Sequence, residues 1–100
     1  MNRVVLEAQV VERAAMRWTP AGLPAIDVRL AHASQIEHAG QMRRVSCEIH
    51  ATAVGELARE VGELAVGAAA IFTGFLGKQR NGRGAMLHIT ELSLHPDSTL

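Results

Sequence analysis

Aromatic residues and cysteine are scarce in this sequence. Its 100 residues include three aromatic side chains, Trp18, Phe72 and Phe75, and a single cysteine, Cys47. One cysteine excludes an intramolecular disulfide and is typical of a reducing compartment. Because Cys47 stands in an alternating apolar run, we expect it to be a buried structural thiol. With so few rings, the chain has little with which to stack on a planar ligand.

The sequence also has no excess of charge and no long apolar run. Ten basic residues balance ten acidic ones, so no global field draws a polyanion to the chain. Any electrostatic site must therefore come from segregation of charge within the fold. No run approaches the length of a membrane helix, and no charged segment followed by an apolar one opens the chain. We expect a cytoplasmic protein without membrane contact.

Signatures of catalysis and of metal binding are missing as well. The five histidines lack ligand-like spacing such as an i, i+4 pair on a helix, so we expect neither a metal nor a cofactor. No Ser/His/Asp arrangement and no phosphate-cradling Gly-Lys-Ser/Thr signature is present. Residues 74–77 lack the third glycine and the following helix of a dinucleotide motif. The sequence therefore predicts a protein that is not an enzyme.

Alternation of apolar and polar residues predicts five β-strands. The segments are 3–15, 25–33, 42–50, 68–77 and 85–94. Between the third and the fourth, Leu57, Val61 and Leu64 follow helical spacing. We expect a short helix within residues 51–65, weakened by its glycines.

This order of elements matches the OB-fold, a partly open Greek-key barrel of five strands. We expect an all-β protein with the short helix between its third and fourth strands. One domain would cover residues 1–100, with a frayed tail at 96–100. In this fold the first-to-second and fourth-to-fifth loops flank the face that binds oligonucleotides. Here those loops are residues 17–24 and 78–84, the two segments least like core.

The second of these loops is a glycine-rich tip that carries three cations, Lys78, Arg80 and Arg83. Asn81-Gly82 favours a tight hairpin because both residues tolerate positive φ. Cations on a flexible ribbon can neutralise phosphates. Clusters of cations on hairpins also commonly have no binding role and only keep the loop tip in contact with water. A basic β-ribbon suits contact with a polyanion better than it suits catalysis.

An ordered set of short motifs resembles the bacterial single-stranded DNA-binding protein superfamily. The motifs are Asn-Arg-Val-Val-Leu at 2–6, Thr-Pro-Ala-Gly at 19–22, Val-Arg-Leu-Ala-His at 28–32, Gly-Phe-Leu at 74–76 and Asn-Gly at 81–82. The closer resemblance is to the PriB branch, primosomal replication protein N. It is carried by Glu-His-Ala-Gly at 37–40, Leu-His-Ile at 87–89 and a length near 100 residues.

The resemblance implies a homodimeric, non-enzymatic protein that binds single-stranded DNA and helps to restart stalled replication forks. Its expected partners are a primosomal helicase (PriA) and a DnaT-like loading factor. By position, Arg17 matches the family's first-hairpin cation, and Lys78 and Arg80 match its second-hairpin cations.

The sequence departs from the family pattern in its third strand, where Gln41 and Ser46 stand in place of aromatic residues. Arg83 and Arg44 are candidates to compensate. We choose Arg44 over its neighbour because adjacent strand residues point to opposite faces and Val45 should point inward. Trp18 is either a relocated stacking ring or a cover for the end of the barrel.

Two further functions are open at this point. A protein–protein adaptor that docks the helicase, with weak or secondary DNA contact, fits the neutral charge and the missing aromatics. An OB-fold subunit that binds RNA or ribosomal components is the third possibility. Val5 and Val11, on the mixed face of the first strand, are more apolar than a solvated face needs, so we expect them at the dimer interface.

Overall fold

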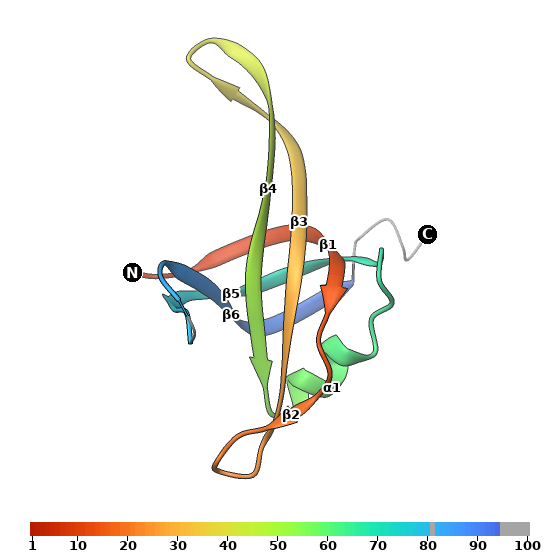
Figure 1. The fold of residues 1–100 in the computed structure, drawn as a ribbon. Helices are drawn as coiled ribbons and strands as arrows, with labels where there is room; N and C mark the ends of the chain where they lie inside the picture. The colour runs from red at the N-terminus through yellow and green to blue at the C-terminus, as the bar shows by residue number, and fades with distance from the viewer. Residues whose placement is uncertain (81, 95–100) are drawn as a thin grey trace.

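The computed structural model describes residues 1–80 and 82–94, which form one barrel with a short helix (Figure 1). Its elements are β1 (Val4–Arg13), β2 (Arg17–Trp18), β3 (Pro24–His38), β4 (Gln41–Val54), α1 (Glu56–Gly62), β5 (Ala69–Lys78) and β6 (Ala85–Leu94). Five of the strands are long, and β2 is a two-residue strand within the first loop. The expected OB-fold barrel, with its helix before the last two strands, is confirmed. The expected tail at 96–100 lies outside the described residues.

The barrel closes through β1, which pairs with two different strands. Residues Val4 to Gln9 run antiparallel to β5, and Gln9 to Arg13 run antiparallel to β3. A register shift between Val10 and Glu12 marks a bulge, which increases the local twist and lets β1 pass from one partner to the other. On the other side, β4 and β6 meet in a short parallel pairing.

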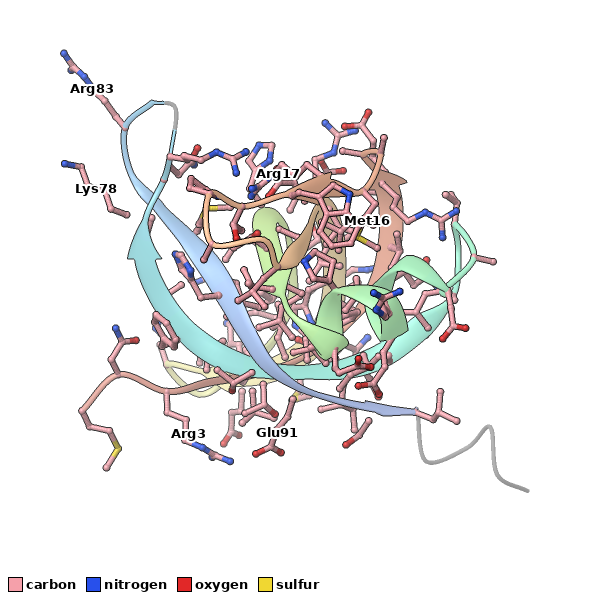
Figure 2. All side chains as sticks on the ribbon, turned by 90° about the horizontal axis from the view of Figure 1, so that it is seen from below. Arg3, Met16, Arg17, Lys78, Arg83 and Glu91 are labelled. Carbon is pink, nitrogen blue, oxygen red and sulfur yellow. The ribbon has the colours of Figure 1, made fainter. Side chains whose placement is uncertain are left out.

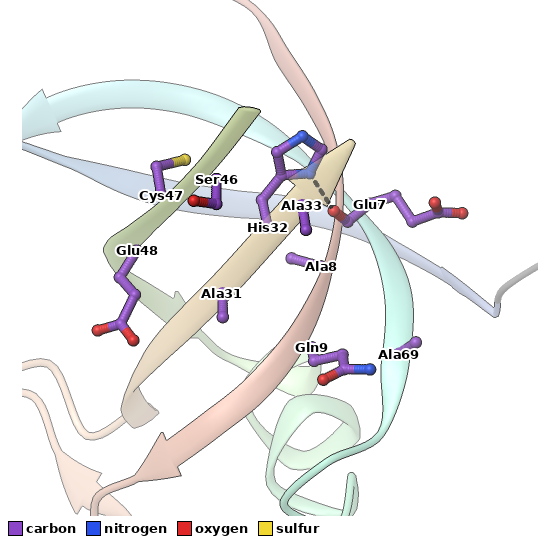
Figure 3. Close-up of a pocket in the computed structure, with 10 residues that line it drawn as sticks. All are labelled: Glu7, Ala8, Gln9, Ala31, His32, Ala33, Ser46, Cys47, Glu48 and Ala69. Atoms are coloured by element: carbon purple, nitrogen blue, oxygen red, sulfur yellow. Dashed lines mark hydrogen bonds between the residues drawn. The ribbon is translucent and has the colours of Figure 1, made fainter. Parts of the chain in front are cut away.

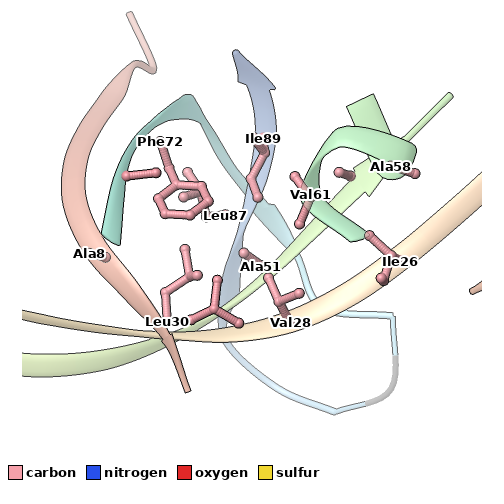
Figure 4. Packing of buried hydrophobic residues seen from close by; sticks show 13 residues of the cluster. Ala8, Ile26, Val28, Leu30, Ala51, Ala58, Val61, Phe72, Leu87 and Ile89 are labelled. Atoms are coloured by element: carbon pink, nitrogen blue, oxygen red, sulfur yellow. The ribbon is translucent and has the colours of Figure 1, made fainter. Parts of the chain in front are cut away.

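The core fills the barrel and extends to α1, whose Ala58 and Val61 are buried (Figure 4). The largest fully buried side chains are Phe72, Leu30, Leu87, Val10 and Val61. Burial of each such side chain contributes roughly 1.5–3 kcal/mol. Along β3, Val28 and Leu30 are buried while Asp27 and Arg29 are half-buried. The same alternation therefore directs a row of charged side chains onto the outer face.

The short helix lies within residues 51–65, as expected. The strand before it was expected to end at residue 50, but residues 51–54 form the end of β4. Ala51 and Ala53 are buried in the barrel core, so packing against the sheet decides their conformation. Gly55 then adopts φ 81°, a conformation that side-chain-bearing residues rarely take, and α1 begins only after it.

β3 and β4 run past the barrel as a two-stranded ribbon (Figure 1). Their pairing continues from Ala31↔Glu48 to His38↔Gln41 and turns at Ala39 and Gly40. Cys47 lies on this ribbon and is exposed, so the expectation of a buried thiol is wrong. Alternation marks which face of a strand is apolar, but it does not mark where the strand leaves the core.

No helix formed by the described residues combines the length and the apolar character needed to cross a membrane.

Candidate nucleic-acid interface

The outer face of β3 and β4 lies between the two loops that the sequence singled out. Cross-strand pairing places Asp27 opposite Thr52, Arg29 opposite His50 and Ala31 opposite Glu48. The first loop joins this face because Arg17 in β2 pairs with Ala25 at the start of β3. The β5–β6 hairpin joins it through a contact of Arg80 with Asp27. The two loops therefore meet on one surface.

Asp27 is at the centre of this surface and binds both loops. Arg17 donates through Nε to Oδ2 and through Nη2 to Oδ1, each at 3.2 Å. Arg80 donates through Nη2 to Oδ2 at 2.7 Å. Partial burial alone would raise the pKa of the Asp27 carboxyl, but hydrogen bonds from Arg17, Arg80 and Thr52 outweigh it and lower the pKa from 3.8 to about 2. The carboxyl is therefore ionised at any pH near neutrality.

Arg29 shows the opposite arrangement on the same face, one cation between two carboxylates. Its Nη2 lies 3.7 Å from Oε2 of Glu12, and its Nε lies 3.4 Å from Oε1 of Glu48. The surface thus alternates in sign instead of forming a uniformly basic patch. The sequence did not indicate that Asp27, Glu12 and Glu48 would lie beside these cations, because residues that meet across strands are far apart in the chain.

Lys78 and Arg83 differ from Arg17 and Arg80. Both are exposed, and neither forms an ion pair with another described residue. Figure 2 shows them on the outer side of the hairpin, pointing away from Arg17. Backbone and side-chain hydrogen bonds from Gln79 to Gly84 and Ala85 close the base of this hairpin. Asn81, the first residue of the expected Asn-Gly turn, lies outside the described residues.

Arg44 lies on the exposed ribbon, opposite Gln35 and on the same face as Glu48. Its neighbour Arg43 points to the other face, where its Nη1 lies 2.9 Å from Nδ1 of His38. Arg44 is therefore the member of the pair that extends the charged outer face along the ribbon.

Trp18 is an exposed ring, with 63% of its surface accessible, so it does not cover the end of the barrel. Phe75 is a second accessible ring, which the sequence did not indicate. Phe75 stacks on His88 with ring centroids 5.0 Å apart and an interplanar angle of 4°. Gly77 makes room for that histidine, since a Cβ there would lie 2.6 Å from Nε2 of His88. Strand periodicity could place Phe75 on the outer face but could not supply its cross-strand partner.

The two valines expected at a dimer interface differ in their exposure. Val5 is 53% exposed on the outer face of β1, and Val11 is half-buried beside the bulge. Pairing with β3 begins only at Gln9, so among the described residues Val4 to Leu6 pair along one edge alone, with β5. Such an edge can accept another strand.

A groove opens where β3 leaves β1, and Cys47 lies on its wall (Figure 3). Four alanines, Ala8, Ala31, Ala33 and Ala69, leave it wide. On one side Nδ1 of His32 donates to the carbonyl oxygen of Glu7 at 2.6 Å. Across residues 1–80 and 82–94, no three His, Cys, Asp or Glu side chains gather as a metal site requires.

Comparison with known proteins identifies the family of this barrel. Residues 2–91 match the model described as another single-strand binding protein family. The replication restart protein PriB of Bordetella pertussis is 44% identical over 80 residues, which cover 80% of this chain and 75% of that protein. PriB of Nitrosomonas europaea is 32% identical over 91 residues, or 90% and 84% of the two chains. The chain belongs to the PriB family.

Solved structures agree with this assignment to the PriB family. PriB from Ralstonia solanacearum superposes with a TM-score of 0.86 at 35% identity, covering 95% of this chain and 98% of that one. A single-stranded DNA-binding protein from Thermus aquaticus gives a TM-score of 0.74 at 25% identity, covering 96% of this chain and 51% of that one. The resemblance seen in the sequence motifs is confirmed.

Proposed function

We propose that this PriB-family chain binds single-stranded DNA and acts in the restart of stalled replication forks. Its curated relatives are named replication restart proteins, and a structural neighbour is a single-stranded DNA-binding protein. The observation that carries the proposal is the meeting of the two loops on the outer face of β3 and β4, where Arg17 and Arg80 converge on Asp27. A strand of DNA lying on that face would touch both loops at once.

Phosphate contacts supply most of the proposed affinity. Lys78 and Arg83 reach outward from the hairpin, and Arg44 continues the track along the ribbon. Each phosphate neutralised on single-stranded DNA makes the slope of log affinity against log salt concentration steeper by about 0.7. Trp18 offers one accessible ring on which a base can stack. We therefore expect more contacts with the DNA backbone than with the bases, and a DNA affinity that depends strongly on salt concentration.

Fluorescence anisotropy with labelled oligo-dT at a series of salt concentrations tests this proposal. We expect binding at low salt that weakens steeply as salt rises. A structured RNA of the same length serves as the comparison, because an RNA-binding OB-fold would prefer it. Absence of binding to oligo-dT at low salt would overturn the proposal.

We also propose that the chain acts as a homodimer in which the Val4–Leu6 edge of β1 meets a second copy. The one-sided pairing of that edge and the exposure of Val5 support this arrangement, and Val11 would lie at its margin. Light scattering after size-exclusion should return twice the chain mass of 10.7 kDa. Val5→Asp should shift the protein toward the monomer, whereas a monomeric wild type would refute the proposal.

A second candidate function is an adaptor that docks the primosomal helicase (PriA) and passes the complex to a DnaT-like loading factor. The charge balance of the outer face favours this adaptor function. Asp27 forms ion pairs with two arginines, and Arg29 forms ion pairs with two carboxylates. A pull-down with the cognate helicase in high salt discriminates, because salt screens phosphate contacts. Capture that persists when oligo-dT binding is lost would support the adaptor.

A further inference from the structure

We propose that Asp27 is an internal competitor for phosphate, which holds the β5–β6 hairpin against the outer face of β3 in the DNA-free chain and which DNA must displace from Arg80. This inference rests on the proposed function, since it concerns how single-stranded DNA gains access to that arginine. The inference gives a carboxylate a role in a binding site that otherwise consists of cations and one aromatic ring.

The three residues come from separate elements of the fold. Asp27 lies on β3, Arg17 on β2, and Arg80 on the hairpin after β5. Arg17 occupies both carboxylate oxygens through two hydrogen bonds, whereas Arg80 reaches Oδ2 through a single nitrogen. Loss of one hydrogen bond therefore separates Arg80 from Asp27, whereas two must break to separate Arg17 from it, and β2 is also paired with β3.

The exposed fractions of the side chains also indicate that Arg80 is the more accessible of the two arginines. The Arg80 side chain is 50% exposed, against 35% for Arg17 and 28% for Asp27. An incoming phosphate thus reaches the guanidinium of Arg80 more readily than that of Arg17. A phosphate oxygen offers the same acceptor chemistry as the carboxylate and can take over its hydrogen bond. Arg17 keeps its two bonds and holds Asp27 in place during the exchange.

Acid does not release this contact in the physiological range. The hydrogen bonds from the arginines hold the pKa of the Asp27 carboxyl at about 2, so its charge persists at neutral pH. The competitor is therefore displaced by a polyanion or weakened by salt. Because salt weakens the Asp27–Arg80 pair as well as the phosphate contacts, the pair should make the salt dependence of DNA binding shallower than the cations alone would give.

Asp27→Asn tests the proposal with little change in side-chain size. The amide oxygen can still accept a hydrogen bond, but the charge that competes with phosphate is gone. We expect labelled oligo-dT to bind roughly three- to tenfold more tightly at low salt, in line with the modest strength of half-exposed ion pairs. The advantage over wild type should shrink as salt rises.

Two matched variants separate this effect from a general loss of negative charge. Glu48→Gln removes one charge from the same face but touches Arg29, not Arg80. Glu56→Gln removes one charge from α1, where it pairs with Arg59. Glu56→Gln should bind oligo-dT within about twofold of wild type, and Glu48→Gln should tighten binding clearly less than Asp27→Asn does, because its partner Arg29 stays paired with Glu12. Equal tightening in Glu48→Gln would show a field effect and overturn the proposal.

A double variant tests the assignment to Arg80. In an Arg80→Ala background, Asp27→Asn should tighten binding by less than about twofold, because the freed cation is absent. Unchanged tightening in that background would contradict the proposal.

Limited trypsin digestion without DNA tests the Asp27–Arg80 contact independently of DNA binding. Cleavage after Arg80 should be faster in folded Asp27→Asn than in wild type, with thermal melting as the check on folding. Equal cleavage would overturn the proposal. Failure of wild type and all variants to bind oligo-dT would instead overturn the proposed function, so the two failures are distinguishable.

Discussion

The cations of the two loops fall into two groups that the structure separates. Arg17 and Arg80 share the carboxylate of Asp27, whereas Lys78 and Arg83 form no ion pair with a described residue. Counted along the sequence, all four are equal contributors to a basic site. In the fold, two are already engaged and two are available. The capacity of a basic loop to bind phosphate therefore depends on the carboxylates that fold beside it as much as on its own charges.

Removing the hairpin cations together should have the largest effect. We expect Lys78→Ala, Arg80→Ala and Arg83→Ala in one chain to weaken oligo-dT binding roughly 30- to 100-fold near 0.1 M salt, because each lost phosphate contact flattens the salt slope by about 0.7. Anisotropy at several salt concentrations measures both quantities. An unchanged slope would move the site away from the hairpin.

Trp18→Ala tests the one accessible ring of the first loop. Stacking of a base on an aromatic side chain contributes roughly 1–3 kcal/mol, so we expect about tenfold weaker binding of oligo-dT. The salt slope should stay as in wild type, since the ring carries no charge. Trp18→Phe is the control and should retain most of the affinity; equal loss in both would argue against stacking.

Single substitutions sharpen the comparison between the free and the engaged cations. Lys78→Ala should weaken binding about fivefold and flatten the salt slope by about 0.7. Arg80→Ala should cost only about two- to threefold and flatten the slope less, because its phosphate contact comes at the expense of the pair with Asp27. Equal effects of the two substitutions would mean that Asp27 does not distinguish them.

Stability against pH gives the smallest expected effect. The pKa of Asp27 is lowered from 3.8 to about 2 in the folded chain, so its charge stabilises the fold above pH 3.8 and that stabilisation is lost as pH falls through about 2. Asp27→Asn should therefore be less stable than wild type at pH 7, by about 1 kcal/mol or less. Urea unfolding at pH 7 and pH 3 should show the difference shrinking at the lower pH. A constant difference would assign the effect to something other than the carboxylate charge.

Periodicity was sufficient to predict the barrel because its strands bury every second residue. Val28 and Leu30 point inward and the residues between them point outward, as the alternation of β3 predicted. It was insufficient for the ends of the elements. Cys47 continues the inward register of β4 on a ribbon that has left the barrel, and residues 51–54 stay in β4 because their alanines pack in the core.

The site was less predictable than the fold. Turn residues and cations located the two loops, but the sequence could not show that Arg17 and Arg80 converge on one carboxylate. Such contacts depend on the cross-strand register and on where a hairpin folds back. The same holds for the stacked pair of Phe75 and His88, which lie on different strands.

An NMR titration of the nitrogen-labelled chain with oligo-dT tests the location of the site most directly. We expect the largest amide shifts at Arg17 and Trp18, at Asp27 and its neighbours on the outer face, and from Lys78 to Ala85, with α1 unshifted. Shifts centred on α1, with both loops unchanged at saturation, would contradict a DNA-binding site formed where the two loops meet.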